Sequence, residues 1–251
     1  MAQQTRFRAR TIGARTLDVL TRAVRGEPPT GHAEQWAELV DAGIATPRRE
    51  LQPRWHEVLT EAATAPVRFE VDSRMGRAGM RSRISLTPRI GLSITERRRL
   101  TVTDDEIAVE AVEDAVEIAF FDPRIIWPAV QRTLPPSPAV RAEGGADPRL
   151  ERTVGVIRDV PERSALPDEV LTRLAGADVE VGLVLQVDNG SATPFVTARH
   201  WFEGDDGRLL EVRLLEDEVE VVEVPAGTVA AEIAWLTVGA FDLRSRARTV
   251  A

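Results

Sequence analysis

The residues of this chain that could do acid–base or metal chemistry are three histidines and two acidic runs. His32, His56 and His200 are far apart, and none is spaced from another histidine or from a carboxylate as in a zinc-binding HExxH helix. The acidic runs, Asp104–Glu106 and Glu216–Glu218, lack the alternating spacing of a calcium-binding loop. We therefore expect no metal site, and we interpret these residues as surface or structural ones.

Residues for covalent or phosphate chemistry are equally scarce. The chain has no cysteine, tyrosine or lysine, which leaves no thiolate or side-chain amine as a nucleophile. No GxSxG elbow and no P-loop occurs, and no GxGxxG motif follows a predicted strand. The segment Gly76–Gly79 contains two glycines, but it lies between two predicted strands, which indicates a hairpin tip. These absences predict a protein that is not an enzyme and that uses no cofactor.

The basic residues, all 32 of them arginines, include eight between positions 74 and 99. A basic strand of this kind could contact phosphates. However, no aromatic residue interleaves with these arginines to stack on bases, and the chain has a net charge of −8. Residues 1–100 hold 18 arginines against 11 acids, and residues 101–251 hold 14 against 29. We expect the two parts to pair within one fold or across a dimer, and we do not expect nucleic acid as a partner.

Hydrophobic spacing predicts helices at the start of the chain and strands after them. Apolar residues recur at helical spacing over residues 14–24, 32–45 and 53–64. From Val67 the period changes to two, which predicts short antiparallel strands with one wet face. Asp122-Pro123 then opens a helix that reaches Leu134. The predicted strands cover residues 67–72, 83–86, 90–94, 100–102, 107–112 and 116–120.

The order of elements begins again after residues 135–148, which are rich in Pro, Gly and Ala and indicate a linker. A helix is predicted over residues 149–157 and a second one from Asp168 to Ala175. Four strands follow, and Pro225 starts a final helix that continues through Phe241. The four predicted strands cover residues 178–187, 193–203, 208–215 and 217–224.

An internal repeat relates the two parts of the chain. Glu57–Thr60 recurs as Glu169–Thr172, and seven of eleven positions from Glu57 match at a constant offset of 112. The predicted fold is therefore α+β, with two related halves arranged with pseudo-two-fold symmetry around a shared antiparallel sheet. Residues 1–135 form the first half, 136–148 the linker, and 149–251 the second half, which packs with the first as one domain.

The sequence also indicates where the protein works. No apolar run approaches the roughly 18 residues that a membrane span requires. The basic N-terminal residues are not followed by the apolar segment of a signal peptide. The absence of cysteine is compatible with a reducing compartment. We expect a cytoplasmic protein without membrane insertion.

The order of elements resembles that of the EspG family. The segment Val116–Pro123 and the helix that follows it to Leu134-Pro135-Pro136 look like the middle of that family's chains. The lysine-free, Arg- and Ala-rich composition also suits an actinobacterial protein. The resemblance implies a cytoplasmic chaperone of type VII (ESX) secretion. Such a chaperone binds the apolar tip of a helical substrate, of the PE–PPE or WXG type.

A chaperone of this kind needs an exposed apolar patch with a polar rim. Candidate partner-binding residues are aromatic and lie in the predicted strand 193–203 and in the last helix. Two alternatives remain open: a homodimeric structural or regulatory protein, and, ranked lower, a small-molecule-binding protein or enzyme with a cleft between the halves. The candidate residues are Phe195, Trp201, Phe202, Trp235 and Phe241.

Overall fold

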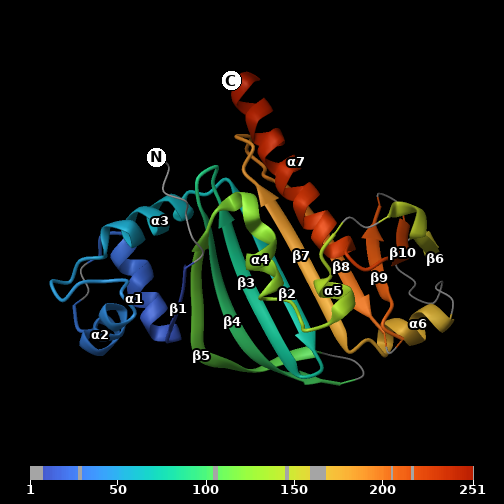
Figure 1. Ribbon diagram of the computed structural model, residues 1–251, viewed down its shortest axis with the longest axis horizontal. Coiled ribbons are helices and arrows are strands. Elements are labelled where there is room, and N and C mark those ends of the chain that lie inside the picture. The colour runs from blue at the N-terminus through green and yellow to red at the C-terminus, as the bar shows by residue number, and fades with distance from the viewer. Residues whose placement is uncertain are drawn as a thin grey trace.

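The computed structural model describes residues 8–27, 30–103, 107–144, 147–158, 168–204, 206–215 and 218–250. One antiparallel sheet of ten strands is combined with helices (Figure 1). The α+β class that the sequence predicts is confirmed.

The first half begins with an edge strand and three helices and continues as a meander of four strands. Successive side chains of a strand point to opposite faces, and β2 accordingly buries Val67, Phe69 and Val71 while Arg68 and Asp72 are exposed. The two-residue turn between β2 and β3 starts at Gly76, whose φ is 55°, so the predicted hairpin tip is confirmed. The elements are β1 (Arg8–Ile12), α1 (Ala14–Val24), α2 (Ala33–Asp41), α3 (Pro53–Ala63), β2 (Val67–Met75), β3 (Ala78–Leu86), β4 (Gly91–Val102), β5 (Ile107–Phe121), η1 (Pro123–Ile125), α4 (Ile126–Gln131) and α5 (Pro138–Arg141).

The second half has the same order of elements but places a single described helix before its meander. The final helix follows Pro225 and is 23 residues long. In both halves the meander follows a helix directly, at the positions where the internal repeat matches. The elements are η2 (Pro148–Leu150), β6 (Arg152–Arg158), α6 (Asp168–Ala175), β7 (Val179–Val187), β8 (Phe195–Glu203), β9 (Leu209–Leu214), β10 (Glu218–Val224) and α7 (Thr228–Val250).

Four strands differ from the expectation. The strand β4 joins the predicted strands 90–94 and 100–102, and β5 joins the predicted strands 107–112 and 116–120. The predicted helix over residues 149–157 is wrong, because the chain forms the strand β6 there and pairs with β10. Its β-branched residues Thr153, Val154 and Val156 favour this pairing over an isolated helical turn. The strand β1 is not among the predicted elements. It has five residues and depends on β5 for its pairing, with Arg8 opposite Phe120.

The segment that joins the halves contributes to the core. Within residues 136–148, α5 is capped by the Ser137 hydroxyl, which accepts a hydrogen bond from the backbone N–H of Val140 at 3.3 Å. Val140 is fully buried, and α5 packs against α7. Part of the predicted linker is therefore an ordered helix.

The two halves meet in the middle of the sheet, at β2 and β7. The strand order is β1-β5-β4-β3-β2-β7-β8-β9-β10-β6. Outward from the seam, each half presents its four meander strands in sequence order and places its first strand at the edge. Strands β1 and β6 thus hold corresponding places, and the seam pairs Val71 with Leu183 at its centre.

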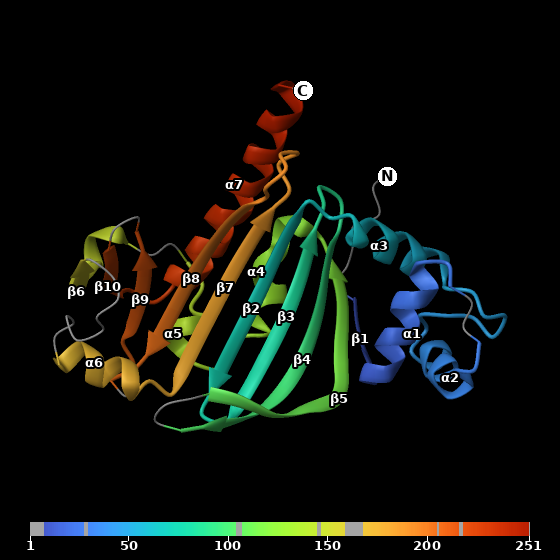
Figure 2. The same cartoon turned by 180° about the vertical axis from the view of Figure 1, so that it is seen from behind.

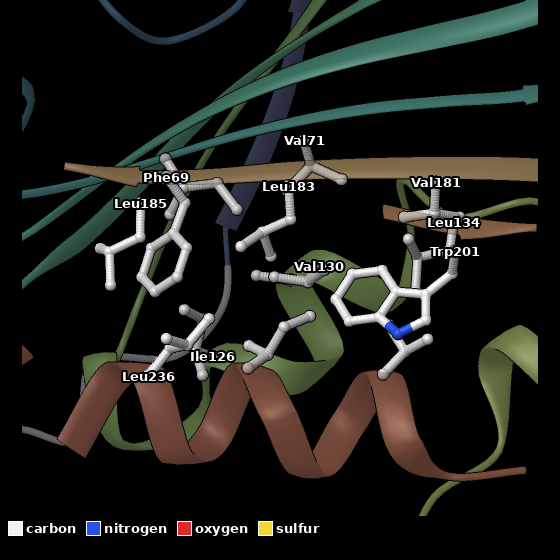
Figure 3. Packing of buried hydrophobic residues seen from close by; sticks show 14 of the residues in the cluster. Phe69, Val71, Ile126, Val130, Leu134, Val181, Leu183, Leu185, Trp201 and Leu236 are labelled. Carbon is white, nitrogen blue, oxygen red and sulfur yellow. The ribbon is translucent and has the colours of Figure 1, made fainter. Parts of the chain in front are cut away.

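The main core lies between one face of the sheet and the helices α4, α5 and α7 (Figure 1). Residues of β2 and β7 such as Phe69 and Leu183 point toward Val130 of α4 and Leu236 of α7 (Figure 3). Trp201 of β8 lies in the same layer and is fully buried. This face, which we call the helix face, is covered along the middle of the sheet.

The opposite face is covered only toward its two ends. Helices α1, α2 and α3 form a second core with β1, β4 and β5, which includes Leu20, Trp55 and Ile118. At the other end Val170 of α6 packs with Leu210 and neighbouring residues of β9 and β10. Figure 2 shows the central strands between these ends without a helix in front of them. We call this part the open face.

Candidate functional site

The helix α7 carries apolar residues on both its inner and its outer side. Its inner side contributes Val229, Ile233, Leu236 and Ala240 to the main core. Its outer side is also apolar, because Trp235 and Val238 stand beside Ala234 and are 65% and 71% exposed. A surface helix such as α1 separates its apolar and polar sides, whereas α7 exposes large apolar residues on the side that faces away from the core. We call Ala234, Trp235 and Val238 the α7 ridge.

A cleft runs along one flank of the α7 ridge. It has a volume of about 640 Å³ and separates α7 from the turns that contain Pro66, Pro88 and Pro123. Val238 and Phe241 of α7 form its helical wall. We call it the proline cleft. The ridge and the cleft together form a continuous, mainly apolar surface on the helix face.

Three of the five candidate partner-binding residues are at least partly exposed on the helix face. Trp235 forms part of the α7 ridge, and the partly buried Phe241 lines the proline cleft. Phe195, at the start of β8, is 46% exposed and shares the helix face with Trp201, because the two are six residues apart in one strand. The structure therefore supports an exposed apolar surface of the kind that the sequence predicts.

The other two candidates do not belong to this exposed surface. Trp201 is a correction, since its side chain is fully buried between the sheet and α7 and is out of reach of any partner in this fold. Phe202 points to the opposite face, where it packs with the core under α6 and its ring stacks on His200 at a centroid distance of 4.4 Å. Sequence alone cannot separate these aromatic residues, because burial depends on which helix covers each face.

The open face holds most of the basic segment 74–99, and acidic neighbours neutralise it. Arg98 lies 3.4 Å from both Asp72 and Glu96, and Arg83 donates to Glu96 at 2.9 Å. Arg81 pairs with Glu70 and lies 3.7 Å from Asp72. Burial raises the pKa of Asp72 above its ordinary value, although Arg98 opposes this shift. This face is thus a lattice of cross-strand ion pairs, which suits exposure to water without a covering helix.

A pair of residues that the sequence did not connect lies in a hollow of about 280 Å³ on the open face. His200 Nε2 lies 2.6 Å from Glu180 Oε1, and Arg74 Nε donates to Glu180 Oε2 at 2.5 Å. The spacing of His200 in the sequence gives no indication of this carboxylate partner. The two residues lie on the adjacent strands β7 and β8. His200 is the cross-strand partner of Gly182, which is two residues after Glu180 in β7. The polar groups of this hollow are bonded to one another, which favours a structural role.

The Glu180 carboxylate should make stability depend on pH. Burial alone would raise its pKa, but hydrogen bonds from His200 and Arg74 outweigh burial and hold the pKa below the ordinary value of 4.5. A carboxyl group with a lowered pKa in the folded state stabilises the fold above pH 4.5, and this contribution is lost as the pH falls through the folded-state pKa. Glu180→Gln should therefore lower the free energy of unfolding by about 1–3 kcal/mol at pH 7.

Urea denaturation at pH 7 and at pH 3 measures this effect. The difference between Glu180→Gln and wild type should shrink at the lower pH, because pH 3 is below the ordinary pKa of 4.5 and part of the stability that the ionised carboxylate contributes is lost there. Glu113→Gln, on an exposed part of β5, is the matched control and should change stability little at either pH. A cost for Glu180→Gln that is the same at both pH values would contradict a role for the ionised group.

Among the described residues, no group of three His, Asp or Glu side chains is placed to hold a metal ion. The acidic positions 104–106 and 216–217 lie outside the described residues. No helix in the described part of the chain is long and apolar enough to cross a membrane.

Comparisons with known proteins do not place the chain in a family. No protein-family model matches it, and no curated protein matches it. Among solved structures, an N-terminal dehydratase from the difficidin assembly line aligns over 92% of this chain and 97% of its own, with 8% identity and a TM-score of 0.14. At this TM-score the likeness does not indicate a shared fold. The functional interpretation therefore depends on the α7 ridge and the proline cleft.

Proposed function

We propose that this protein is a cytoplasmic chaperone or adaptor, similar to the EspG family, that binds the apolar tip of a helical type VII secretion substrate. The observation that carries the proposal is the α7 ridge, where Trp235 and Val238 are 65% and 71% exposed on a helix that is also apolar on its inner side. Exposed apolar patches of this kind mark sites of protein interaction. A partner helix of the PE–PPE or WXG type would cover the ridge with its own apolar residues.

The arrangement of the halves supports the same proposal, because the EspG resemblance implies two related halves. We infer a pseudo-two-fold axis that passes between Val71 and Leu183 at the seam. These two residues are cross-strand partners and are 112 positions apart, which is the offset of the internal repeat. The strand order on either side of the seam is also the same when read outward.

Homodimer formation is the second candidate, and the sheet edges argue against one form of it. Edge strands that carry charged residues resist pairing with a second sheet. The edge strand β1 carries the exposed Arg8 and Arg10, and β6 carries the exposed Arg152. Pairing of two such edges would place arginines of like charge opposite each other. These charges disfavour a homodimer that joins two sheets edge to edge, and the α7 ridge is an apolar surface that a homodimer could use instead.

Co-expression tests the choice between a partner and a second copy. The tagged chain would be produced with a PE–PPE or WXG-type pair encoded beside its gene, and the purified complex would be sized by light scattering. The proposal predicts a complex that contains one copy of this chain and the helical pair. Recovery of the chain only with copies of itself would contradict the chaperone function and favour the homodimer.

A further inference from the structure

The charged side chains that line the proline cleft are both basic. They are Arg124 and Arg244, and none of the described acidic side chains lines the cleft. The two hydroxyl groups in its wall already donate hydrogen bonds within α7. Thr237 donates to the carbonyl of Ile233, and Ser245 donates to the carbonyl of Asp242. The guanidinium groups are therefore the strongest hydrogen-bond donors that the cleft offers to a ligand.

Both arginines are held in place from outside the cleft. Arg124 donates to both carboxylate oxygens of Asp122, two residues before it, and its side chain is 82% exposed. Arg244 donates from Nη1 to the carbonyl of Asp188 at 2.6 Å and lies 3.5 Å from the Oδ1 atom of the same residue, and its side chain is 23% exposed. The Nε of Arg244 is buried and has no hydrogen-bond partner among the described residues. A guanidinium has five N–H donors in a planar fork, so each arginine retains donors for a further acceptor.

The remaining walls of the cleft are apolar. Ile126, Val238 and Phe241 face the space together with the three prolines. A ligand that suits both features has an apolar body and a neighbouring anionic group. Arginine binds carboxylates better than a lysine would, because its planar fork matches the two carboxylate oxygens.

We propose that the proline cleft accepts an apolar side chain of the partner while Arg244 and Arg124 bind a carboxylate next to it. This inference rests on the proposed function, because the ligand is taken to be a segment of the helical partner. The apolar residue and the acidic residue would lie within one turn of the partner helix, since residues three or four apart share a helix face. The α7 ridge would bind the remaining apolar residues of the same helix. The acidic residue thus sets the orientation of the partner.

Two fluorescent probes test the cleft without the partner. 8-Anilinonaphthalene-1-sulfonate has an apolar body and an anionic group, and N-phenyl-1-naphthylamine has the same rings without the charge. We expect the wild type to bind the anionic probe about tenfold more tightly than the neutral one, because a charge-assisted hydrogen bond contributes this much to affinity. Arg244→Met should remove most of the difference and leave the affinity for the neutral probe unchanged.

Two further variants make the outcome specific. Arg244→Met removes a largely buried side chain and could lower stability. Arg124→Met removes an exposed side chain, so it tests the cleft independently, and it should also reduce the preference for the anionic probe. Arg246→Met is the matched control, because Arg246 is on the same helix, is 76% exposed and pairs with Asp242 outside the cleft. It should leave both affinities within twofold of the wild type.

The inference is overturned if the wild type binds the two probes equally, or if Arg246→Met weakens the anionic probe as much as Arg244→Met does. If either result is found while the partner is still captured in the co-expression test, the anionic subsite is rejected and the proposed function is retained. If the partner is not captured in the co-expression test but the wild type still prefers the anionic probe, the proposed function is rejected. The cleft would then be an anionic subsite for another ligand.

Discussion

Val238→Asp should abolish capture of the helical partner while the free energy of unfolding stays within about 0.5 kcal/mol of wild type. The side chain of Val238 is 71% exposed at the centre of the α7 ridge, so an aspartate there remains solvated in the free protein. In the complex the same carboxylate would be buried against apolar residues without a partner, which costs several kcal/mol. Trp235→Ala should weaken binding by about 30-fold or more, as expected for a tryptophan at the centre of an interface.

Val112→Asp is the matched control for this experiment. Val112 is an apolar residue of β5 that is 51% exposed, and it does not belong to the α7 ridge. The same substitution there should leave partner capture unchanged. Affinities would be measured by isothermal titration with the purified partner pair, and folding by urea denaturation. Equal losses for Val112→Asp and Val238→Asp would contradict docking at the ridge.

Trp201→Ala should be among the most destabilising single substitutions in the protein. Trp201 is fully buried and is the largest of the side chains that the main core encloses completely. Truncation of a buried tryptophan leaves a cavity and costs about 3–5 kcal/mol. Trp235→Ala removes the same indole from an exposed site and should change stability by about 0.5 kcal/mol or less. The two variants thus separate core from surface for residues that the sequence alone placed in one group.

Urea denaturation followed by far-ultraviolet circular dichroism measures both effects, because this signal does not depend on the removed tryptophan. The midpoint of Trp201→Ala should fall well below that of the wild type, and the midpoint of Trp235→Ala should remain near it. A large loss of stability for Trp235→Ala would mean that α7 is packed on its outer side. That result would also remove the ridge as a docking surface.

The meander strands could be predicted from sequence, whereas the edge strands could not. In β2 and β7 the alternation of apolar and polar residues indicates strand directly, because each has a wet face and a buried face. Strands β1 and β6 are short and exist through pairing with β5 and β10. For β1 the partner strand is distant in the sequence, with Ile12 opposite Val116. No local pattern records such a pairing, which explains why both corresponding edge strands were missed.

The residue types of the candidate site could be predicted from the sequence, but the positions of their side chains relative to water and to each other could not. The last helix and its aromatic residues follow from Pro225 and the apolar spacing after it. Which side of α7 faces water depends on the sheet beneath it, and a rotation of the helix by about 100° would exchange the roles of Trp235 and Leu236. The pairing of Glu180 with His200 likewise depends on the register of β7 and β8. These features are tertiary, and the sequence carries only the residue types.

Hydroxyl-radical footprinting of the free chain and of its complex with the helical pair tests the central claim most directly. This method reports the solvent exposure of individual side chains by mass spectrometry. Docking on the α7 ridge predicts that oxidation of Trp235 and Val238 falls several-fold in the complex, while Val112 on β5 is oxidised equally in both samples. A stable complex in which Trp235 and Val238 stay as reactive as in the free chain would contradict the proposed binding site.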